Sequence, residues 1–445
     1  MRWLWNHADV GAIALLATGL RILVLLAALS QLSPETHLSL SADVTNYTTA
    51  ARSIVTGGHE HETAIFSFGP GYPLFLSAVF FIFGVKAAPV LVIQLLLSVA
   101  SCLMLYSLAR YLTGSRGIAA ATGLIAALSP TSIELSCVML SDTLYFFTIL
   151  AALHLLLRGL DRLNTTLVCL SGLAFGYAAL TRSIGQFWPI AYFVIVIAYY
   201  CMCRPATMPL AVFRRKLAVC SIAGLVVLLG IVSGWMVRNQ IVHGLPTMAF
   251  TSAGGPATIA ALSLSGADEK NYRDTTNQWV RDYMAAHKLD SLSSEDLFRL
   301  LQRKAREVFL ADPVRVFKAY LRLSWTNIND ITYVHRSIVP RFNPKTIPVE
   351  YFIKNHELNH IPLVMSMLGL ICLALRRRWY VLAVLGVVYA YYACLVGAFP
   401  WQGSRFFMPA QIAWTILTPV AIAESIRWLM SVFRYRKQAA TSGLQ

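Results

Sequence analysis

Long apolar runs separated by short polar connections extend along most of this chain. A helix of roughly 17 to 25 apolar residues crosses the hydrocarbon core of a bilayer. Runs of about that size lie at 11–31, 88–111, 117–134, 139–157, 166–181, 185–203, 217–236, 361–375, 379–398 and 406–429. The pattern predicts an all-α polytopic membrane protein with about 10 transmembrane helices.

One further apolar segment, GYPLFLSAVFFIFG at 71–84, is short for a span and contains a proline near its start. It is either an eleventh span or a helix that lies in the membrane interface. If it does not cross, the basic clusters between the runs all fall on one side of the membrane, as the positive-inside rule requires. These clusters are Arg116, Arg158 with Arg162, Arg204 with 214–216, 376–378, and Arg434 with 436–437. We therefore expect an interfacial helix and cytoplasmic termini.

Two connections are long enough to carry structure of their own, and both are expected outside the cytoplasm. The first extracytoplasmic loop is 32–87, and the second, 237–360, is expected to fold as a small, mostly helical cap. Its stretch 293–313 has helical apolar spacing behind a Ser/Glu capping pattern. The predicted domains are an N-terminal transmembrane module at 1–236, the cap at 237–360, C-terminal transmembrane helices at 361–430, and a basic cytoplasmic tail at 431–445.

Composition supports a membrane protein and excludes other classes. The chain has 445 residues, of which 57% are hydrophobic and 13% charged, so its expected partner is the lipid bilayer. The net charge of +16 is spread over helix ends, so no nucleic-acid partner is expected. The 8 cysteines show neither zinc-ligand spacing nor a disulfide framework. The first apolar run lacks a convincing signal-peptide cleavage site, so it is expected to be a transmembrane helix. The expected location of the protein is a bacterial or archaeal plasma membrane.

The extracytoplasmic rim holds the groups that sugar transfer from a polyprenyl phosphate requires. Such an enzyme needs a base for the acceptor hydroxyl, cations for the departing phosphate, and an apolar groove for the lipid. Asp43 is the candidate base, because a carboxylate can take the proton of an attacking hydroxyl. Asp43 could instead cap the helix predicted by TNYTTAARSIV. The residues alone favour these two roles equally.

Cations at the outer ends of predicted helices are the candidates for binding the donor phosphate. They are Arg182, Arg238 and Arg405, with Lys86 as a weaker fourth. A guanidinium binds phosphate with two parallel hydrogen bonds. The alternative for each arginine is snorkelling to water without a ligand, but three arginines on the less basic side favour the phosphate role.

Three further polar features lie in or beside the apolar runs. Asp142 begins a predicted helix, and it either caps that helix or supports Asp43 and an arginine at the active rim. The run HEHE at 59–62 cannot converge on one ion from a regular helix or strand, so a divalent metal is not supported and no cofactor is predicted. Arg21, in the middle of the first run, should face the bundle or snorkel.

The segment ADVTNYTTAARSIVTGG resembles the first-loop motif of GT-C glycosyltransferases of the protein O-mannosyltransferase and aminoarabinose-transferase type. In that motif an acid is followed four residues later by tyrosine and then by small residues, which matches Asp43, Tyr47 and Ala50. Five other segments are similar to family segments and follow in the expected order. They are GPGYPLFLSAVFFIFG, LSPTSIELSCVMLSDTLYFF, ALTRSIGQFWP, GWMVRNQIVHGLPTMAFTSAGG and GSRFFMPAQIAWTIL.

The resemblance extends from about residue 11 to 429 and implies an extracytoplasmic site, a polyprenyl-phosphate sugar donor, and inversion at the anomeric carbon. Carried over by position, it makes Asp43 the base and Asp142 its supporting acid. It makes Arg182, Arg238 and Arg405 donor-side or structural cations, and we add Tyr47 and Tyr72 as candidate positioning residues. Val44 stands where many relatives have a second acid, so an acidic pair is in doubt. The cap lacks the strand pattern of a β-trefoil.

The leading hypothesis is therefore an inverting membrane glycosyltransferase, of hexosyl or pentosyl type, with a protein, lipid or cell-envelope glycan as acceptor. A transporter or flippase of a lipid-linked or charged substrate is the alternative, although Arg21 is the main intramembrane charge available to it. A scaffold for other membrane enzymes is a third reading. The sequence leaves the sugar and the acceptor open.

Overall fold

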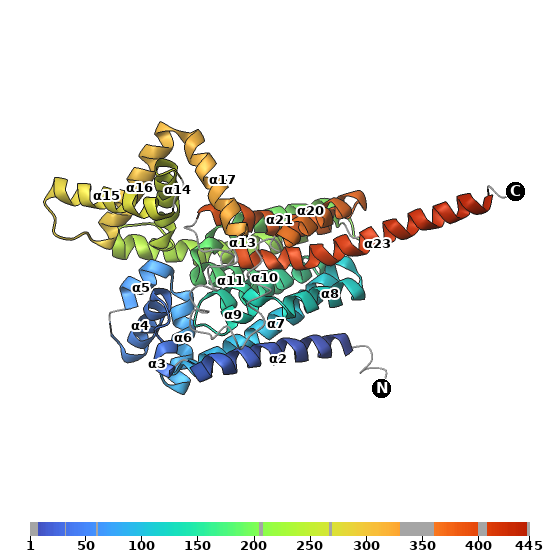
Figure 1. Ribbon diagram of the computed structural model, residues 1–445, viewed down its shortest axis with the longest axis horizontal. Helices are drawn as coiled ribbons and strands as arrows, with labels where there is room; N and C mark the ends of the chain where they lie inside the picture. Colours follow the sequence, from blue (N-terminus) through green and yellow to red (C-terminus); the bar gives the residue numbers. More distant parts are fainter. Residues whose placement is uncertain are drawn as a thin grey trace.

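The computed structural model describes residues 8–31, 33–58, 61–203, 208–266, 269–329, 360–398 and 407–442, and it has no strand in these ranges (Figure 1). The predicted all-α fold is confirmed. The helices are α2 (Ala8–Gln31), α3 (Pro34–His37), α4 (Ala42–Thr56), α5 (His61–Phe68), α6 (Gly71–Phe83), α7 (Ala87–Thr113), α8 (Arg116–Ala127), α9 (Pro130–Ser136), α10 (Asp142–Asp161), α11 (Thr165–Thr181), η1 (Ser183–Phe187), α12 (Trp188–Met202), α13 (Leu210–His243), α14 (Thr251–Leu264), α15 (Glu269–His287), α16 (Ser294–Ala311), α17 (Pro313–Asn329), α20 (His360–Leu375), α21 (Trp379–Leu395), η4 (Val396–Ala398), η5 (Met408–Ala410) and α23 (Gln411–Ser442).

The apolar runs of the sequence form the helices of a membrane bundle. Within the described residues, 6 helical segments are long and apolar enough to cross a bilayer, and a bent pair of helices would make 7. The six are Ala8–Ser30, Ala87–Thr113, Asp142–Asp161, Ser183–Met202, Leu210–His243 and Met408–Arg434. The remaining predicted spans correspond to the shorter apolar helices α11, α20 and α21 and to the bent pair. The chain is thus a polytopic membrane protein, while the number of crossings stays a prediction.

The run at 117–134 is not one straight helix. It consists of α8 and α9, which meet at an angle of 53°. Ser129 begins the second helix as its N-cap, with Pro130 at the first helical position. Proline lacks the N–H that would continue the hydrogen bonds of α8, so the bend follows from the local sequence.

Arg21 is buried beside this bend. Its side chain is 0% exposed, and it donates to the carbonyl of Ala127, the last residue of α8 (3.2 Å). It also donates to Ser132 Oγ on α9 (3.1 Å) and to Ser98 Oγ on α7 (2.8 Å). Of the two expectations for Arg21, burial in the bundle is the one observed. The guanidinium supplies hydrogen bonds that the bent helix and its neighbour need in the absence of water.

Helix α6 corresponds to the segment 71–84, which the sequence predicts to lie in the membrane interface. Its 13 residues extend about 20 Å at 1.5 Å per residue, less than the ~30 Å of a hydrocarbon core. Tyr72, Leu76 and Phe80 are buried, whereas Phe81 and Ile82 are 80% and 69% exposed. This one-sided burial agrees with an interfacial helix, and the depth of α6 in the bilayer stays a prediction.

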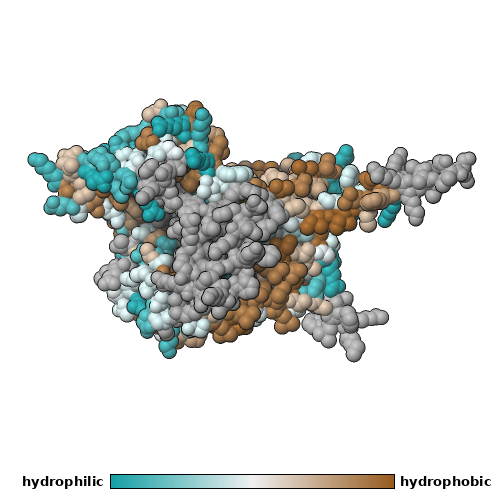
Figure 2. All heavy atoms as spheres, viewed as in Figure 1, coloured by the Kyte–Doolittle hydropathy of each residue, from teal (hydrophilic) through white to brown (hydrophobic). Residues whose placement is uncertain are grey.

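The two ends of the bundle differ in character. Helices α3–α6 and α14–α17 gather at one end, and the start of α2 and the end of α23 lie at the other (Figure 1). The surface along the bundle is largely hydrophobic, whereas the helices α14–α17 carry a more hydrophilic surface (Figure 2). We call the first end the loop end and the second the tail end.

Helices α14–α17 are the main described part of the segment 237–360, for which the sequence predicts a helical cap, and we call these four helices the cap. Residues 267–268 and 330–359 of that segment lie outside the described residues. Ser293 accepts a hydrogen bond from the N–H of Asp296 and so caps α16, as its sequence predicts. A small apolar core joins α14 and α17, formed by Ile259, Ala261, Leu262, Val316, Ala319 and Leu323. Asn327 at the end of α17 donates to the carbonyl of Val396 (2.9 Å). The cap therefore rests on the C-terminal helices as well as on α13, which continues to His243.

Candidate active site

Asp43 lies in the first turn of α4, at the loop end of the bundle. Ser41, not Asp43, is the N-cap residue, because Ser41 Oγ accepts a hydrogen bond from the N–H of Val44 (3.3 Å). Asp43 is partly exposed, while Val44 beside it is fully buried. The alternative of Asp43 as the helix cap is therefore wrong. A carboxylate in the first turn still benefits from the helix dipole.

Tyr47 connects α4 to the start of α10. It lies one turn after Asp43, about 6 Å along the helix axis. Its hydroxyl is 3.4 Å from Ser141 Oγ, and its ring packs edge-on against Tyr72 with ring centroids 4.9 Å apart. Ser141 directly precedes Asp142. Tyr47 thus brings the helix that carries Asp43 against the segment that carries Asp142.

Tyr72 is linked to the same segment through Gln94. Its hydroxyl donates to Gln94 Oε1 (2.5 Å), and Gln94 Nε2 donates to the carbonyl of Val138 (2.7 Å). Both side chains are fully buried. Buried polar groups in a lipid-surrounded bundle need such partners, so this chain of bonds determines the path of residues 137–141 toward α10.

Asp142 and Arg182 form a buried ion pair. Their side chains are 1% and 8% exposed, and Arg182 Nη1 donates to Asp142 Oδ1. Arg182 is the C-cap residue of α11, where the chain turns into η1. Its guanidinium also lies 5.9 Å from the ring centroid of Tyr145, one turn into α10. The pair joins the start of α10 to the end of α11, one residue after Ser141 in the chain.

The turn before α6 packs tightly against the end of α11. A Cβ on Gly71 would lie 2.5 Å from Thr181 Oγ1 and 2.6 Å from its backbone nitrogen. Gly69 has φ +93°, a conformation that side chains disfavour. Tyr177 donates to the carbonyl of Gly71 (2.9 Å). The sequence GPG therefore allows the first loop to approach the residue next to Arg182.

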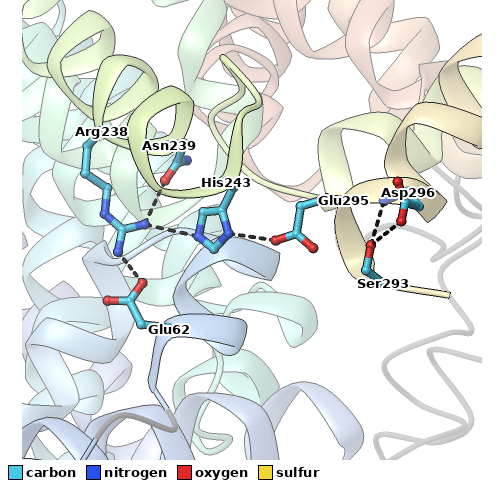
Figure 3. Close-up of polar contacts among 7 residues, drawn as sticks. All are labelled: Glu62, Arg238, Asn239, His243, Ser293, Glu295 and Asp296. Carbon is cyan, nitrogen blue, oxygen red and sulfur yellow. Dashed lines mark hydrogen bonds and ion pairs between the residues drawn. The ribbon is translucent and has the colours of Figure 1, made fainter. Parts of the chain in front are cut away.

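A second polar cluster joins the first loop to the cap (Figure 3). Arg238 at the end of α13 pairs with Glu62 of α5. His243 lies 3.4 Å from Arg238 through Nε2 and 2.9 Å from Glu295 Oε1 of α16 through Nδ1. The hydrogen bond to His243 holds the pKa of Glu295 below its usual range. We call these four residues the cap latch.

Helix α5 connects the cap latch with the Asp43 region. Phe66 stacks on the ring of His243, with centroids 3.9 Å apart, and Phe68 packs against Tyr47 at 5.4 Å. Phe250 donates its N–H to the carbonyl of Phe66 (2.7 Å). A shift of α5 would therefore move both groups of residues.

The structure brings together some of the predicted site residues and separates others. Tyr47, Tyr72, Asp142 and Arg182 belong to one connected region, with Asp43 on the same helix as Tyr47. Arg238 belongs to the cap latch, and Lys86 is exposed at the start of α7. Arg405 lies outside the described residues, as do His59 and Glu60 of the HEHE run. Among the described residues, no group of three His, Cys, Asp or Glu side chains could hold a metal ion.

Sequence reasoning missed several residues of this region. Gln94 and Ser141 lie within apolar runs, and a single serine in such a run carries no positional signal. His243 and Glu295 are 52 residues apart, and their contact depends on how the cap folds back. A buried glutamine in a membrane run is rare enough to be a signal, and it was the one available clue.

Comparisons with known proteins agree with this geometry. Residues 67–236 match the family described as dolichyl-phosphate-mannose-protein mannosyltransferase. The fold is similar to archaeal oligosaccharyltransferase AglB from Archaeoglobus fulgidus in complex with an inhibitory peptide and a dolichol-phosphate, with a TM-score of 0.51 and 13% identity over 98% of this chain. The apo form of the Archaeoglobus fulgidus oligosaccharyltransferase matches with a TM-score of 0.52 and 15% identity over 98% of this chain.

This chain spans about half the length of those oligosaccharyltransferases, 52% in both comparisons. No curated protein matches it in sequence. The residues matched by the family include the segments GPGYP, LSDTLYFF and ALTRSIGQFWP. The resemblance that the motifs indicated is confirmed: the chain is an all-α polytopic membrane protein with the GT-C fold, similar over residues 67–236 to the dolichyl-phosphate-mannose-protein mannosyltransferases.

Proposed function

We propose that this protein is an inverting membrane glycosyltransferase that moves one sugar from a polyprenyl phosphate, undecaprenyl or dolichyl, to an acceptor outside the cytoplasm. The family match and the shared fold support the class of enzyme. The observation that carries the assignment of the base is the position of Asp43. Its carboxylate is partly exposed, is not the helix cap, and lies one turn from the Tyr47–Ser141 contact.

In the proposed reaction, Asp43 accepts the proton of the acceptor hydroxyl as the hydroxyl oxygen attacks the anomeric carbon. The new carbon–oxygen bond forms on the face opposite the phosphate, so the configuration inverts. The bond from the anomeric carbon to the phosphate oxygen breaks, and polyprenyl phosphate leaves with the electron pair. Tyr47 and the Asp142–Arg182 pair act as positioning residues. Tyr47 holds α4 against the start of α10, and the ion pair holds the start of α10 against the end of α11.

The departing phosphate needs positive charge. Arg182 and Arg238 are each paired with a carboxylate, so their net contribution to the field at a phosphate is reduced. Lys86 has no ion pair among the described residues, and Arg405 is the candidate at the predicted outer end of the last span. We propose Arg405 as the main phosphate ligand, with Arg182 and Arg238 acting mainly as structural cations.

Orientation is part of the proposal. The start of α2 and the end of α23 lie at the same end of the bundle (Figure 1), as an even number of crossings requires. The basic clusters 376–378 and Arg116 lie in or beside turns at this tail end, and such clusters face the cytoplasm in membrane proteins. We therefore propose that Asp43 and the cap face outward and that a protein, lipid or cell-envelope glycan is the acceptor.

The test is the substitution Asp43→Asn. We expect transfer to fall by roughly 10²- to 10⁴-fold, the usual contribution of a general base, with thermal stability nearly unchanged because Ser41 still caps the helix. Mass spectrometry of envelope glycans and glycoproteins, compared between cells with the wild-type and variant proteins, would detect the missing sugar and identify the acceptor.

The matched control is Ser41→Ala. It removes the cap of the same helix turn, at a cost of about 1 kcal/mol in stability, and should leave transfer largely intact. Full activity of Asp43→Asn would disprove the assignment of the base. Movement of a labelled lipid-linked sugar across vesicles without any glycosylated product would instead support a transporter.

A further inference from the structure

A positively charged cavity lies at the tail end of the bundle, opposite Asp43. Its volume is about 230 Å³, several times the ~30 Å³ that a water molecule occupies in the liquid. Its wall includes Arg376, Arg378 and Arg427 with Glu424 as the one acid. Three arginines and one glutamate give a formal charge of +2. The helices around it are α7, α8, α20, α21 and α23.

Glu424 arranges two of the arginines side by side. One of its carboxylate oxygens accepts from Arg376 Nε and Nη2 (2.9 and 2.8 Å), and the other accepts from Arg427 Nη1 (2.6 Å). Arg378 Nη2 donates to the carbonyl of Thr113 (3.1 Å). An arginine has five N–H groups, so each of the three retains donors that no described residue accepts.

The rest of the wall suits an anion with an apolar tail. Ser115, which also lines the cavity, caps α8 by accepting from the N–H of Ile118, and a helix N-terminus carries partial positive charge. The lining also contains the apolar residues Leu112, Ile118, Leu373, Val381 and Val420. Charged donors and an apolar wall therefore meet within one cavity between the ends of membrane helices.

We propose that this cavity binds the phosphate group of an anionic membrane lipid, whose acyl chains continue along the apolar bundle surface. Guanidinium groups match phosphate oxygens in geometry and charge, and basic pockets between helix ends bind anionic lipid head groups. Simple snorkelling would bring each arginine to water separately, whereas here one glutamate holds two guanidiniums at a shared cavity. The site is independent of Asp43 and of the proposed sugar transfer.

The test compares two adjacent arginines in the purified full-length protein. Arg377 and Arg378 lie in the same turn and are both exposed, but of the two only Arg378 lines the cavity. Native mass spectrometry would measure retained lipid after exchange into phosphatidylglycerol or phosphatidylcholine. We expect preferential retention of phosphatidylglycerol, weakened roughly ten-fold in Arg378→Gln by the loss of charge-assisted hydrogen bonds and nearly unchanged in Arg377→Gln.

Equal losses in the two variants would mean attraction by bulk charge and would overturn the proposal. Equal retention of both lipids would overturn it as well, and so would displacement of phosphatidylglycerol by inorganic phosphate at similar concentration, because the site would then be one for free phosphate. If Arg378→Gln fails to fold, Arg427→Gln replaces it, since Arg427 is exposed and its hydrogen bond and ion pair are with Glu424. The same selective loss is expected there, and its absence would disprove the lipid site.

Discussion

At the scale of single residues, the charges buried at the loop end are each matched by a partner. Asp142 and Arg182 are 40 positions apart in the chain, yet they form one buried ion pair. The sequence predicted Asp142 as a helix cap or as a support for Asp43 and an arginine, and Arg182 as a phosphate ligand or a snorkelling side chain. It did not identify Arg182 as the partner of Asp142. Because a buried charge is costly unless it is paired, the pair constrains α10 and α11 to meet at this point.

The first prediction concerns Asp142→Asn. The variant leaves Arg182, 8% exposed, without its counter-charge, and breaking a buried pair in this way costs about 3 to 5 kcal/mol. Thermal unfolding of the purified protein in detergent would measure the loss. The double variant Asp142→Asn with Arg182→Gln should recover part of it, since no unpaired charge remains. An Asp142→Asn protein as stable as the wild type would contradict the structural role of the pair.

At the scale of elements, local sequence determines where helices begin and bend, and tertiary contacts determine where they point. Ser41, Ser129 and Ser293 each cap a helix, and the cap at Ser293 was predicted from its pattern. The bend between α8 and α9 was not predicted, although Pro130 marks it. Arg21, more than 100 residues earlier in the chain, donates a hydrogen bond to the carbonyl of Ala127 at the bend.

The second prediction concerns Arg21→Met, which keeps a long, unbranched side chain but removes the N–H donors of the guanidinium. The Ala127 carbonyl and the Ser132 hydroxyl lose a charge-assisted hydrogen bond away from water, so we expect the stability to fall by about 2 kcal/mol. Hydrogen exchange should accelerate locally over residues 128–141. Leu26→Met, an exposed position on the same helix, is the control. Unchanged exchange at the bend would show that Arg21 does not stabilise it.

At the scale of the whole molecule, the cap latch ties together three parts of the chain that are far apart in sequence. Glu62 comes from the first loop, Arg238 and His243 from the end of α13, and Glu295 from the cap. Glu62 lies on α5, and Phe68 at the end of the same helix packs against the ring of Tyr47. The position of the cap is therefore coupled to the helix that carries Asp43.

The third prediction is a pH dependence of this coupling. The pKa of Glu295 is lowered in the folded protein by its hydrogen bond with His243, so the unfolded state binds the proton more readily. The stabilising contribution is present above the usual glutamate pKa of about 4.3 and is lost as the pH falls through the lower folded-state value. The protection factor of α16, which is the intrinsic exchange rate at each pH divided by the observed rate, should therefore fall on acidification.

Glu295→Gln should remove most of that acid response, because it has no carboxylate to protonate. The adjacent Asp296→Asn is the matched control, since Asp296 bonds to Ser293 rather than to His243. If the acid response persists in Glu295→Gln and disappears in Asp296→Asn, it belongs to Asp296, and the prediction for Glu295 is wrong.

The sequence by itself determined the membrane class, the helical fold and the order of the family-like segments, because helix length and apolar periodicity are local properties. It also singled out Asp43, Asp142 and Arg182. Only the tertiary structure decided that Ser41 is the cap of α4, that Asp142 pairs with Arg182, and that Arg238 pairs with Glu62. The physical reason is that a charge buried in a bundle takes whichever partner the packing brings near, and packing depends on segments far apart in the chain.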